Sequence, residues 1–179
     1  MKTLLHICCA PCSIECISTL RGEGIEPTGF WYNPNIHPYT EYRNRHDALQ
    51  TYAKNIEMEL VDAAGYGLRP FLEALAGDVD SRCGTCYAMR MEATAAYAAK
   101  AGFDSFTTTL LISPYQRHED IKAAATHAAE EYGVAFLYRD FRPAFREGQK
   151  KARETGLYMQ KYCGCIFSEE ERYARKKGQ

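Results

Sequence analysis

The chain has 179 residues, of which 46% are hydrophobic and 25% are charged, a balance typical of a soluble globular protein. No apolar run approaches the ~18 residues that a membrane span needs, and the few residues before the first cysteine do not form a signal peptide. We therefore expect one domain over residues 1–179, a cytoplasmic location and no membrane partner.

The net charge of −1 does not by itself favour nucleic acid, but the charge is unevenly distributed. Residues 1–138 hold 11 basic and 17 acidic side chains, whereas residues 139–179 hold 11 basic and 6 acidic ones. Residues 139–179, which we call the basic C-terminal region, are therefore predicted to build a surface that faces a polyanion. We expect this region to be helical.

Hydrophobic periodicity and turn residues divide the chain into alternating strands and helices. In chain order we predict a strand at residues 3–8, a helix at 13–21 with Ser13 as N-cap, a strand at 28–32, a helix at 40–54, a strand at 56–61, helices at 69–76 and 83–101, a strand at 105–111, a helix at 119–132, a strand at 134–138 and a helix at 143–154. Five rounds of alternation indicate an α/β fold, in which helices flank both faces of a parallel sheet. Such folds bind ligands near the first strand–helix turn.

Cysteines occupy that first turn, where many α/β proteins carry a glycine-rich loop for phosphate. Cys8, Cys9 and Cys12 lie within five residues, and Cys83 and Cys86 open another helix. Eight cysteines in a cytoplasmic chain favour metal or redox chemistry over structural disulfides. Two helix N-termini that converge would both stabilise an anionic metal–thiolate centre, with Arg82 and Arg90 placed to offset its charge.

Spacing alone leaves the metal open. Two Cys-x2-Cys pairs are typical of structural zinc, and Cys9/Cys12 with Cys83/Cys86 fit that pattern. Adjacent ligands such as Cys8 and Cys9 suit an iron–sulfur cluster better. Cys16, one turn into the first helix, is expected to be a core residue.

Cys163 and Cys165 are separated by one glycine in the basic C-terminal region. A disulfide between them would form a tight, strained ring that is easily reduced. The pair is therefore interpreted as a redox switch or electron relay, and the alternative is two free thiols in a mobile tail. Upstream, Arg142, Arg146, Lys150 and Arg153 share one helix face, which is either a phosphate contact or a solvated surface.

Taken together, these motifs resemble the QueH family, the cobalamin-independent epoxyqueuosine reductases. The matching stretches run almost end to end in the same order. They are Leu5–Ser13, Phe30–Pro38, Arg82–Cys86 with Arg90, Thr107–Pro114 and Tyr158–Phe167.

This resemblance implies an oxidoreductase that removes the epoxide oxygen of epoxyqueuosine at the tRNA wobble position to give queuosine. It also implies a Rossmann-like, nucleotide alpha-hydrolase-like fold and a [4Fe-4S] cluster. The cluster ligands would be Cys8, Cys9, Cys83 and Cys86. Cys163 and Cys165 would form a redox-active disulfide, and Cys12 lies where a ligand of an additional iron ion could come from.

With tRNA as substrate, the basic helix face becomes a phosphate contact, and an unidentified electron donor is needed. Four residues are candidates for the required proton donor: Tyr32, His37, Glu41 and Tyr162.

Two other functions remain open. An iron–sulfur-dependent tRNA sulfur transferase would need an ATP-binding loop after the first strand, where this chain has cysteines. A zinc-stabilised binding protein without catalysis would be colourless and would retain its metal in air.

Overall fold

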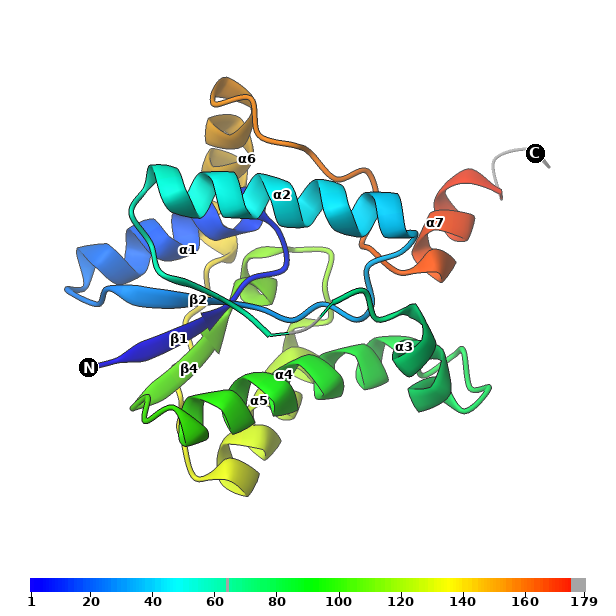
Figure 1. Ribbon diagram of the computed structural model, residues 1–179, viewed down its shortest axis with the longest axis horizontal. Coiled ribbons are helices and arrows are strands. Elements are labelled where there is room, and N and C mark those ends of the chain that lie inside the picture. Colours follow the sequence, from blue (N-terminus) through cyan, green and yellow to red (C-terminus); the bar gives the residue numbers. More distant parts are fainter. Residues whose placement is uncertain (64, 175–179) are drawn as a thin grey trace.

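A computed structural model describes residues 1–63 and 65–174. The strands are β1 Thr3–His6, β2 Pro27–Trp31, β3 Leu60–Asp62, β4 Ser105–Thr108 and β5 Ala135–Phe136. The helices are α1 Ala10–Gly22, α2 Tyr39–Asn55, α3 Leu68–Leu75, α4 Arg82–Lys100, α5 His118–Tyr132, α6 Phe145–Glu154 and α7 Ile166–Tyr173, with 3-10 turns η1 Thr109–Ile112 and η2 Arg142–Ala144. Figure 1 shows their arrangement.

The strands form one parallel sheet in the order β3-β2-β1-β4-β5, which confirms the predicted parallel sheet. Thr3 of β1 lies opposite Pro27 on one side and Ser105 on the other. All four residues of β1 are buried, because helices cover both faces of the sheet.

Helices α1, α2 and α6 lie on one side of the sheet, and α4 and α5 pack together on the other (Figure 1). Leu4, Leu5 and Ile7 lie at the centre of the core, each fully buried. Helix α2 packs on this core through Tyr42, Leu49 and Ala53, which are all buried.

β1 lies at the centre of the sheet, between β2 and β4. The chain passes from β1 to β2 and β3 on one side, and then crosses to β4 and β5 on the other side. The carboxyl edge of the sheet at such a reversal is where parallel α/β folds bind their ligands. The segment that follows α6 runs to this edge, and α7 lies beside it (Figure 1). The fold therefore brings the first cysteine turn and the Cys-Gly-Cys motif to the same end of the molecule.

The first helix begins earlier than predicted, and Ser13 is not its N-cap. α1 begins at Ala10 after Cys9, with Pro11 in the first turn, where a missing backbone N–H carries no penalty. The Ser13 hydroxyl instead donates to the Ala10 carbonyl at 2.8 Å. Cys12 therefore lies on the first helical turn rather than in a loop.

Four predicted strands are shorter than expected. β1 ends at His6 instead of residue 8, and β5 is Ala135–Phe136 instead of 134–138. In place of residues 56–61, β3 begins at Leu60, because Ile56 ends α2 and Glu57 adopts a left-handed φ of 54°. In place of residues 105–111, β4 ends at Thr108, whose hydroxyl accepts from the Leu110 N–H and starts a 3-10 turn.

At the C-terminal end, Pro143 lies in a 3-10 turn rather than at the start of the helix, which begins at Phe145. α7 is a second helix of the C-terminal region, which was predicted to be helical, although the bounds of α7 were not predicted. Among the described residues, no helix is both long enough and apolar enough to cross a membrane.

Candidate active site

A cavity of about 740 Å³ lies at the carboxyl edge of the sheet, next to the residues that follow β1 and β4. Five cysteines contribute to its wall: Cys8, Cys12, Cys83, Cys163 and Cys165. A much smaller cavity of about 20 Å³ is lined by Cys83 and Cys86 together with Cys163 and Cys165. The cysteines that are far apart in the sequence thus surround one region.

The first turn is fixed by the ends of the neighbouring strands. The Cys8 N–H donates to the Thr109 hydroxyl at 3.1 Å, and the Asn33 amide donates to the Ile7 carbonyl at 2.9 Å. Burial lowers the pKa of His6 to about 4, so its ring is neutral and donates from Nε2 to the Tyr32 carbonyl at 3.2 Å. These contacts hold the cysteine turn rigidly against the sheet.

Cys8, Cys9 and Cys12 form the cysteine triad, whose sulfurs all lie within 4.8 Å of one another. The Cys8 and Cys9 sulfurs are 3.9 Å apart. Hydrogen bonds from the Cys12 and Cys9 thiols lower the pKa of Cys8, whereas burial raises the pKa of Cys9. Soft thiolate donors at this spacing can bind a metal ion or cluster.

A second sulfur group lies at the start of α4. The Cys86 sulfur accepts a hydrogen bond from Arg90 Nη2 at 2.9 Å, and burial raises the pKa of this thiol to about 12. Arg90 is only 2% exposed and has no carboxylate partner among the described ion pairs. A buried cation without a carboxylate is costly unless an anionic group lies nearby. Arg90 therefore places a positive charge beside the Cys86 sulfur, where it would offset the negative charge of a metal-bound thiolate.

The predicted ligand set combines these two groups. In the described part of the chain, the cysteine triad is the one group of three or more metal-binding side chains within 4.8 Å. Cys83 and Cys86 lie outside that group, although Cys83 shares the large cavity with Cys8. The assignment of Cys8, Cys9, Cys83 and Cys86 to one cluster therefore stays a prediction. Cys16 is fully buried in the core, as expected.

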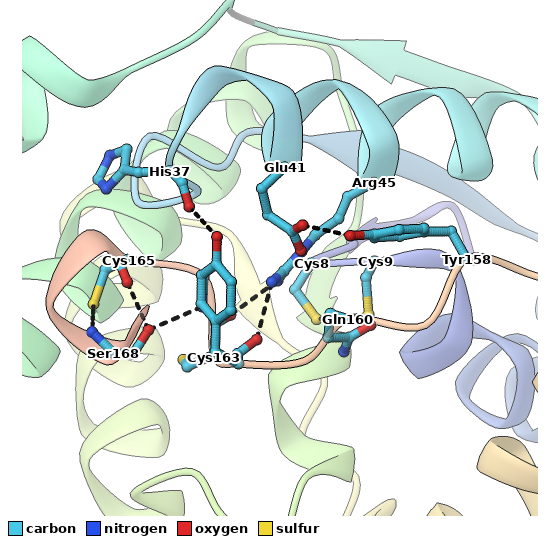
Figure 2. A network of polar contacts seen from close by, with 12 residues as sticks. Cys8, Cys9, His37, Glu41, Arg45, Tyr158, Gln160, Cys163, Cys165 and Ser168 are labelled. Atoms are coloured by element: carbon cyan, nitrogen blue, oxygen red, sulfur yellow. Dashed lines mark hydrogen bonds and ion pairs between the residues drawn. The ribbon is translucent and has the colours of Figure 1, made fainter. Parts of the chain in front are cut away.

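The Cys-Gly-Cys segment is held by a buried arginine that the sequence analysis missed. Arg45 donates from Nη1 to the Cys163 carbonyl and from Nη2 to the Tyr162 carbonyl, both at 2.9 Å (Figure 2). Its Nε pairs with Glu41 at 2.7 Å, and Glu41 also accepts from the Tyr158 hydroxyl. One ion pair on α2 thus positions the backbone of the C-terminal segment.

His37 fixes the same segment from the other side (Figure 2). Its backbone N–H donates to the Gly164 carbonyl at 2.8 Å, and its Nδ1 accepts from the Ile166 N–H at 3.2 Å. Its Nε2 donates to the Pro34 carbonyl at 2.8 Å, and burial lowers the pKa of the ring. The Tyr162 hydroxyl donates to the His37 carbonyl.

These contacts bear on the proton-donor candidates. Three of the candidates have polar atoms that hold the C-terminal segment. His37 Nδ1 accepts from Ile166, Glu41 accepts from Tyr158, and the Tyr162 hydroxyl donates to the His37 carbonyl. Tyr162 is the one of the four candidates that also lines the large cavity, whereas Tyr32 lies just after β2 and contributes its carbonyl to His6.

Gly164 lies at the tightest point of the segment, with φ at +146°. A Cβ there would lie 3.3 Å from both Arg45 Nη1 and Asn35 Nδ2. Only glycine therefore fits between the two cysteines without displacing the groups that hold them.

The two thiols of the motif have different environments, and both are free. Cys163 is exposed, and its sulfur accepts from the Gln116 amide at 3.2 Å. Cys165 is 8% exposed, and its sulfur accepts from the Ser168 N–H at 3.3 Å, which makes it the N-cap of α7. One thiol thus faces the cavity mouth while the other is protected.

All four predicted basic side chains are exposed. Arg146, Lys150 and Arg153 lie on α6, whereas Arg142 lies in η2, before the helix begins. Arg142 pairs with Asp140 at 2.6 Å, and Lys150 lies 3.9 Å from Glu154. Within the described part of the chain, the cavity lining takes Phe145 and Gln149 from α6 but none of these four basic side chains.

Two amides in the cavity wall were also missed by the sequence analysis. Asn35 Oδ1 and Gln160 Oε1 are buried without a hydrogen-bond partner among the described residues, while the Gln160 amide nitrogen lies 3.6 Å from the Cys12 sulfur. Buried acceptors of this kind are normally satisfied by water or a bound group. The Asn-Pro-Asn turn offered a signal for Asn35, but nothing in the sequence singles out Gln160.

Comparison with known proteins finds relatives along nearly the whole chain. The sequence profile described as Epoxyqueuosine reductase QueH matches residues 3–171. A protein named Epoxyqueuosine reductase QueH from Dehalococcoides mccartyi is 37% identical, covering 97% of this chain and 96% of that protein. Another of the same name from Thermotoga maritima is 35% identical, covering 98% of this chain and 97% of that protein.

A solved structure supports the fold alone. It is described as a predicted subunit of tRNA methyltransferase from Methanocaldococcus jannaschii, and it matches with a TM-score of 0.56 at 9% identity, covering 100% of this chain and 89% of that chain. The predicted nucleotide alpha-hydrolase-like fold is thereby confirmed. Given the profile match and the full-length similarity to these relatives, the chain belongs to the epoxyqueuosine reductase QueH family.

Proposed function

We propose that this protein reduces epoxyqueuosine in tRNA to queuosine, releasing the epoxide oxygen as water. The observation that carries the proposal is that two members of the cysteine triad, Cys8 and Cys12, line one cavity of about 740 Å³ together with the Cys163/Cys165 pair. A cavity of this size accommodates a modified base. The thiols that line it would supply both metal ligands and reducing groups.

The residues present fit an iron–sulfur cluster. Cys8, Cys9, Cys83 and Cys86 would hold a [4Fe-4S] cluster, and Cys12, the third thiol of the cysteine triad, would be a ligand of an additional iron ion. The buried Arg90 beside Cys86 supports this assignment, because its charge needs an anionic neighbour. When bound, the cluster supplies electrons one at a time.

The cysteine pair completes the electron balance. Converting the epoxide to an alkene and water consumes two electrons and two protons. Oxidation of the Cys163 and Cys165 thiols to a disulfide releases the same number, and an external reductant of unidentified chemistry then restores the dithiol. The exposed Cys163 suits exchange with that reductant, and the buried Cys165 suits the role of its protected partner.

The test is conversion of epoxyqueuosine-containing tRNA to queuosine-containing tRNA by anaerobic protein, followed by mass spectrometry of the nucleosides. Cys163→Ser should abolish multiple turnover, whereas Cys16→Ala, which removes a core thiol outside the cavity, should retain it. Unchanged turnover of Cys163→Ser with every reductant would remove the pair from the reaction. No conversion by the cluster-loaded wild type would refute the proposed function itself.

The basic surface formed by Arg142 of η2 and by Arg146, Lys150 and Arg153 of α6 is proposed as a phosphate contact for the body of the tRNA. Its exposure supports this role, although Asp140 and Glu154 partly neutralise it.

A further inference from the structure

The mouth of the large cavity carries positive charge that the sequence did not reveal. Its lining holds six basic side chains and one carboxylate: Arg45, Arg82, Arg90, Arg117, Lys161 and Arg172, with Glu171. Glu171 is paired with Arg82. A concave surface with one sign of charge attracts the opposite charge strongly, even though the whole chain has a net charge of −1.

Three of these cations are free to meet a ligand at the surface. Lys161 and Arg172 are exposed and have no ion pair among the described residues. Arg117 has a side chain 62% exposed and lies 3.7 Å from Asp120. They come from three segments, namely the connection to α5, the segment after α6, and α7. All three line the cavity and are exposed to solvent, and we call them the mouth cations.

Tyr115 is the most exposed large hydrophobic side chain in the described structure, at 85%. It lines the cavity and lies edge-on against Phe145, with ring centroids 5.8 Å apart. Because Phe145 contacts the ring edge-on, Tyr115 keeps a solvent-facing surface at the cavity. An aromatic ring held in this way is suited to stacking on an unpaired base.

The turn that carries Tyr115 is fixed in place. The Tyr115 N–H donates to the Ser113 hydroxyl at 3.3 Å, and the next residue, Gln116, accepts from the Tyr87 hydroxyl at 2.6 Å. The Gln116 amide nitrogen also donates to the Cys163 sulfur. The exposed ring is therefore positioned one residue away from a direct contact with the cysteine pair.

We propose that this mouth binds a single-stranded RNA loop, with a base stacked on Tyr115 and the flanking phosphates bound by the mouth cations. The inference rests on the proposed function, because it places the loop that carries the modified base over the cysteines. The mouth would then determine specificity for RNA, and the basic residues of α6 would contact only phosphates farther from the modified base.

Binding of cluster-loaded protein to an anticodon stem-loop RNA tests this directly, measured as a dissociation constant at several salt concentrations. Tyr115→Ala should weaken binding about tenfold, and Tyr115→Phe should restore it. Tyr132→Ala, which removes another exposed tyrosine on α5, is the matched control and should bind like wild type. Wild-type affinity of Tyr115→Ala would overturn the stacking assignment.

The phosphate contacts are tested by the salt dependence of RNA binding. Replacing Lys161 and Arg172 by alanine should reduce the slope of log affinity against log salt by about 1.4, the value for two contacts to single-stranded RNA. The matched double variant Lys150→Ala with Arg153→Ala should change this slope less. If the α6 variant carries the slope and the mouth variant does not, the inference is wrong.

The RNA site and the reductase activity can be refuted independently of each other. If wild type reduces epoxyqueuosine-tRNA while the mouth variants bind RNA normally, the mouth assignment is overturned and the reductase activity stands. If wild type binds RNA through the mouth but reduces no epoxide, the proposed function fails and the RNA site stands.

Discussion

Replacing Arg45 by methionine should release the Cys-Gly-Cys segment and destabilise the whole protein. The side chains of Arg45 and Glu41 are 2% and 9% exposed, so the substitution leaves a buried carboxylate without its cation. Breaking a buried pair from one side costs about 3–5 kcal/mol. The carbonyls of Tyr162 and Cys163 also lose their donors. Against a typical total of about 5–15 kcal/mol, this is a large fraction of the stability.

Urea unfolding of the metal-free, reduced protein measures the global loss. The alkylation rate of Cys165, which is 8% exposed in the folded protein, measures local release of the segment. Arg43→Met is the matched control, since Arg43 lies on the same helix with a side chain 61% exposed and a 3.7 Å contact to Asp47. We expect that control to change stability by less than about 0.5 kcal/mol. The reasoning is refuted if Arg45→Met changes neither the unfolding free energy nor the protection of Cys165.

Three further predictions concern the same site. Because burial lowers the pKa of His37, its neutral ring is favoured in the folded state. The free energy of unfolding should therefore fall as the pH drops below about 6.5. In urea titrations at several pH values, His37→Gln should flatten this dependence, whereas His127→Gln, at an exposed histidine, should not. Arg90→Met should leave the unfolding free energy of the metal-free protein within about 1 kcal/mol of the wild-type value, or raise it, and should weaken retention of the cluster. A strongly destabilised metal-free variant would contradict the role assigned to Arg90. Cys83→Ala should lose most of its iron and visible absorbance after anaerobic reconstitution, whereas Cys16→Ala should retain both.

The sequence predicted the sheet and most helices because alternating apolar segments and glycine-rich helix ends dominate their formation. The sequence predicted the ends of strands and helices less well where a single side chain determines the end. The Thr108 hydroxyl ends β4 by capping the next turn, and α1 begins at Ala10, three residues before Ser13, with Pro11 in its first turn. Such local choices depend on partners that periodicity does not reveal.

The cysteines were predictable as a site because thiol spacing carries chemical meaning by itself. Arg45, Gln116 and Tyr115 were not, because each acquires its importance from a neighbour far away in the sequence. Arg45 reaches the Cys163 carbonyl over 118 residues, and Gln116 reaches the Cys163 sulfur over 47. The basic face of α6 was predicted from helical spacing, but the positive mouth combines residues from several segments that only the fold brings together.

The most direct test of this account is the iron and acid-labile sulfide content of anaerobically purified protein, with its visible spectrum. We predict about four or five irons and about four sulfides per chain, with the broad absorbance of a [4Fe-4S] cluster. About one zinc per chain, without sulfide or colour, would instead indicate a structural thiolate site. That result would contradict the central claim that the cysteines around this cavity hold a redox cofactor.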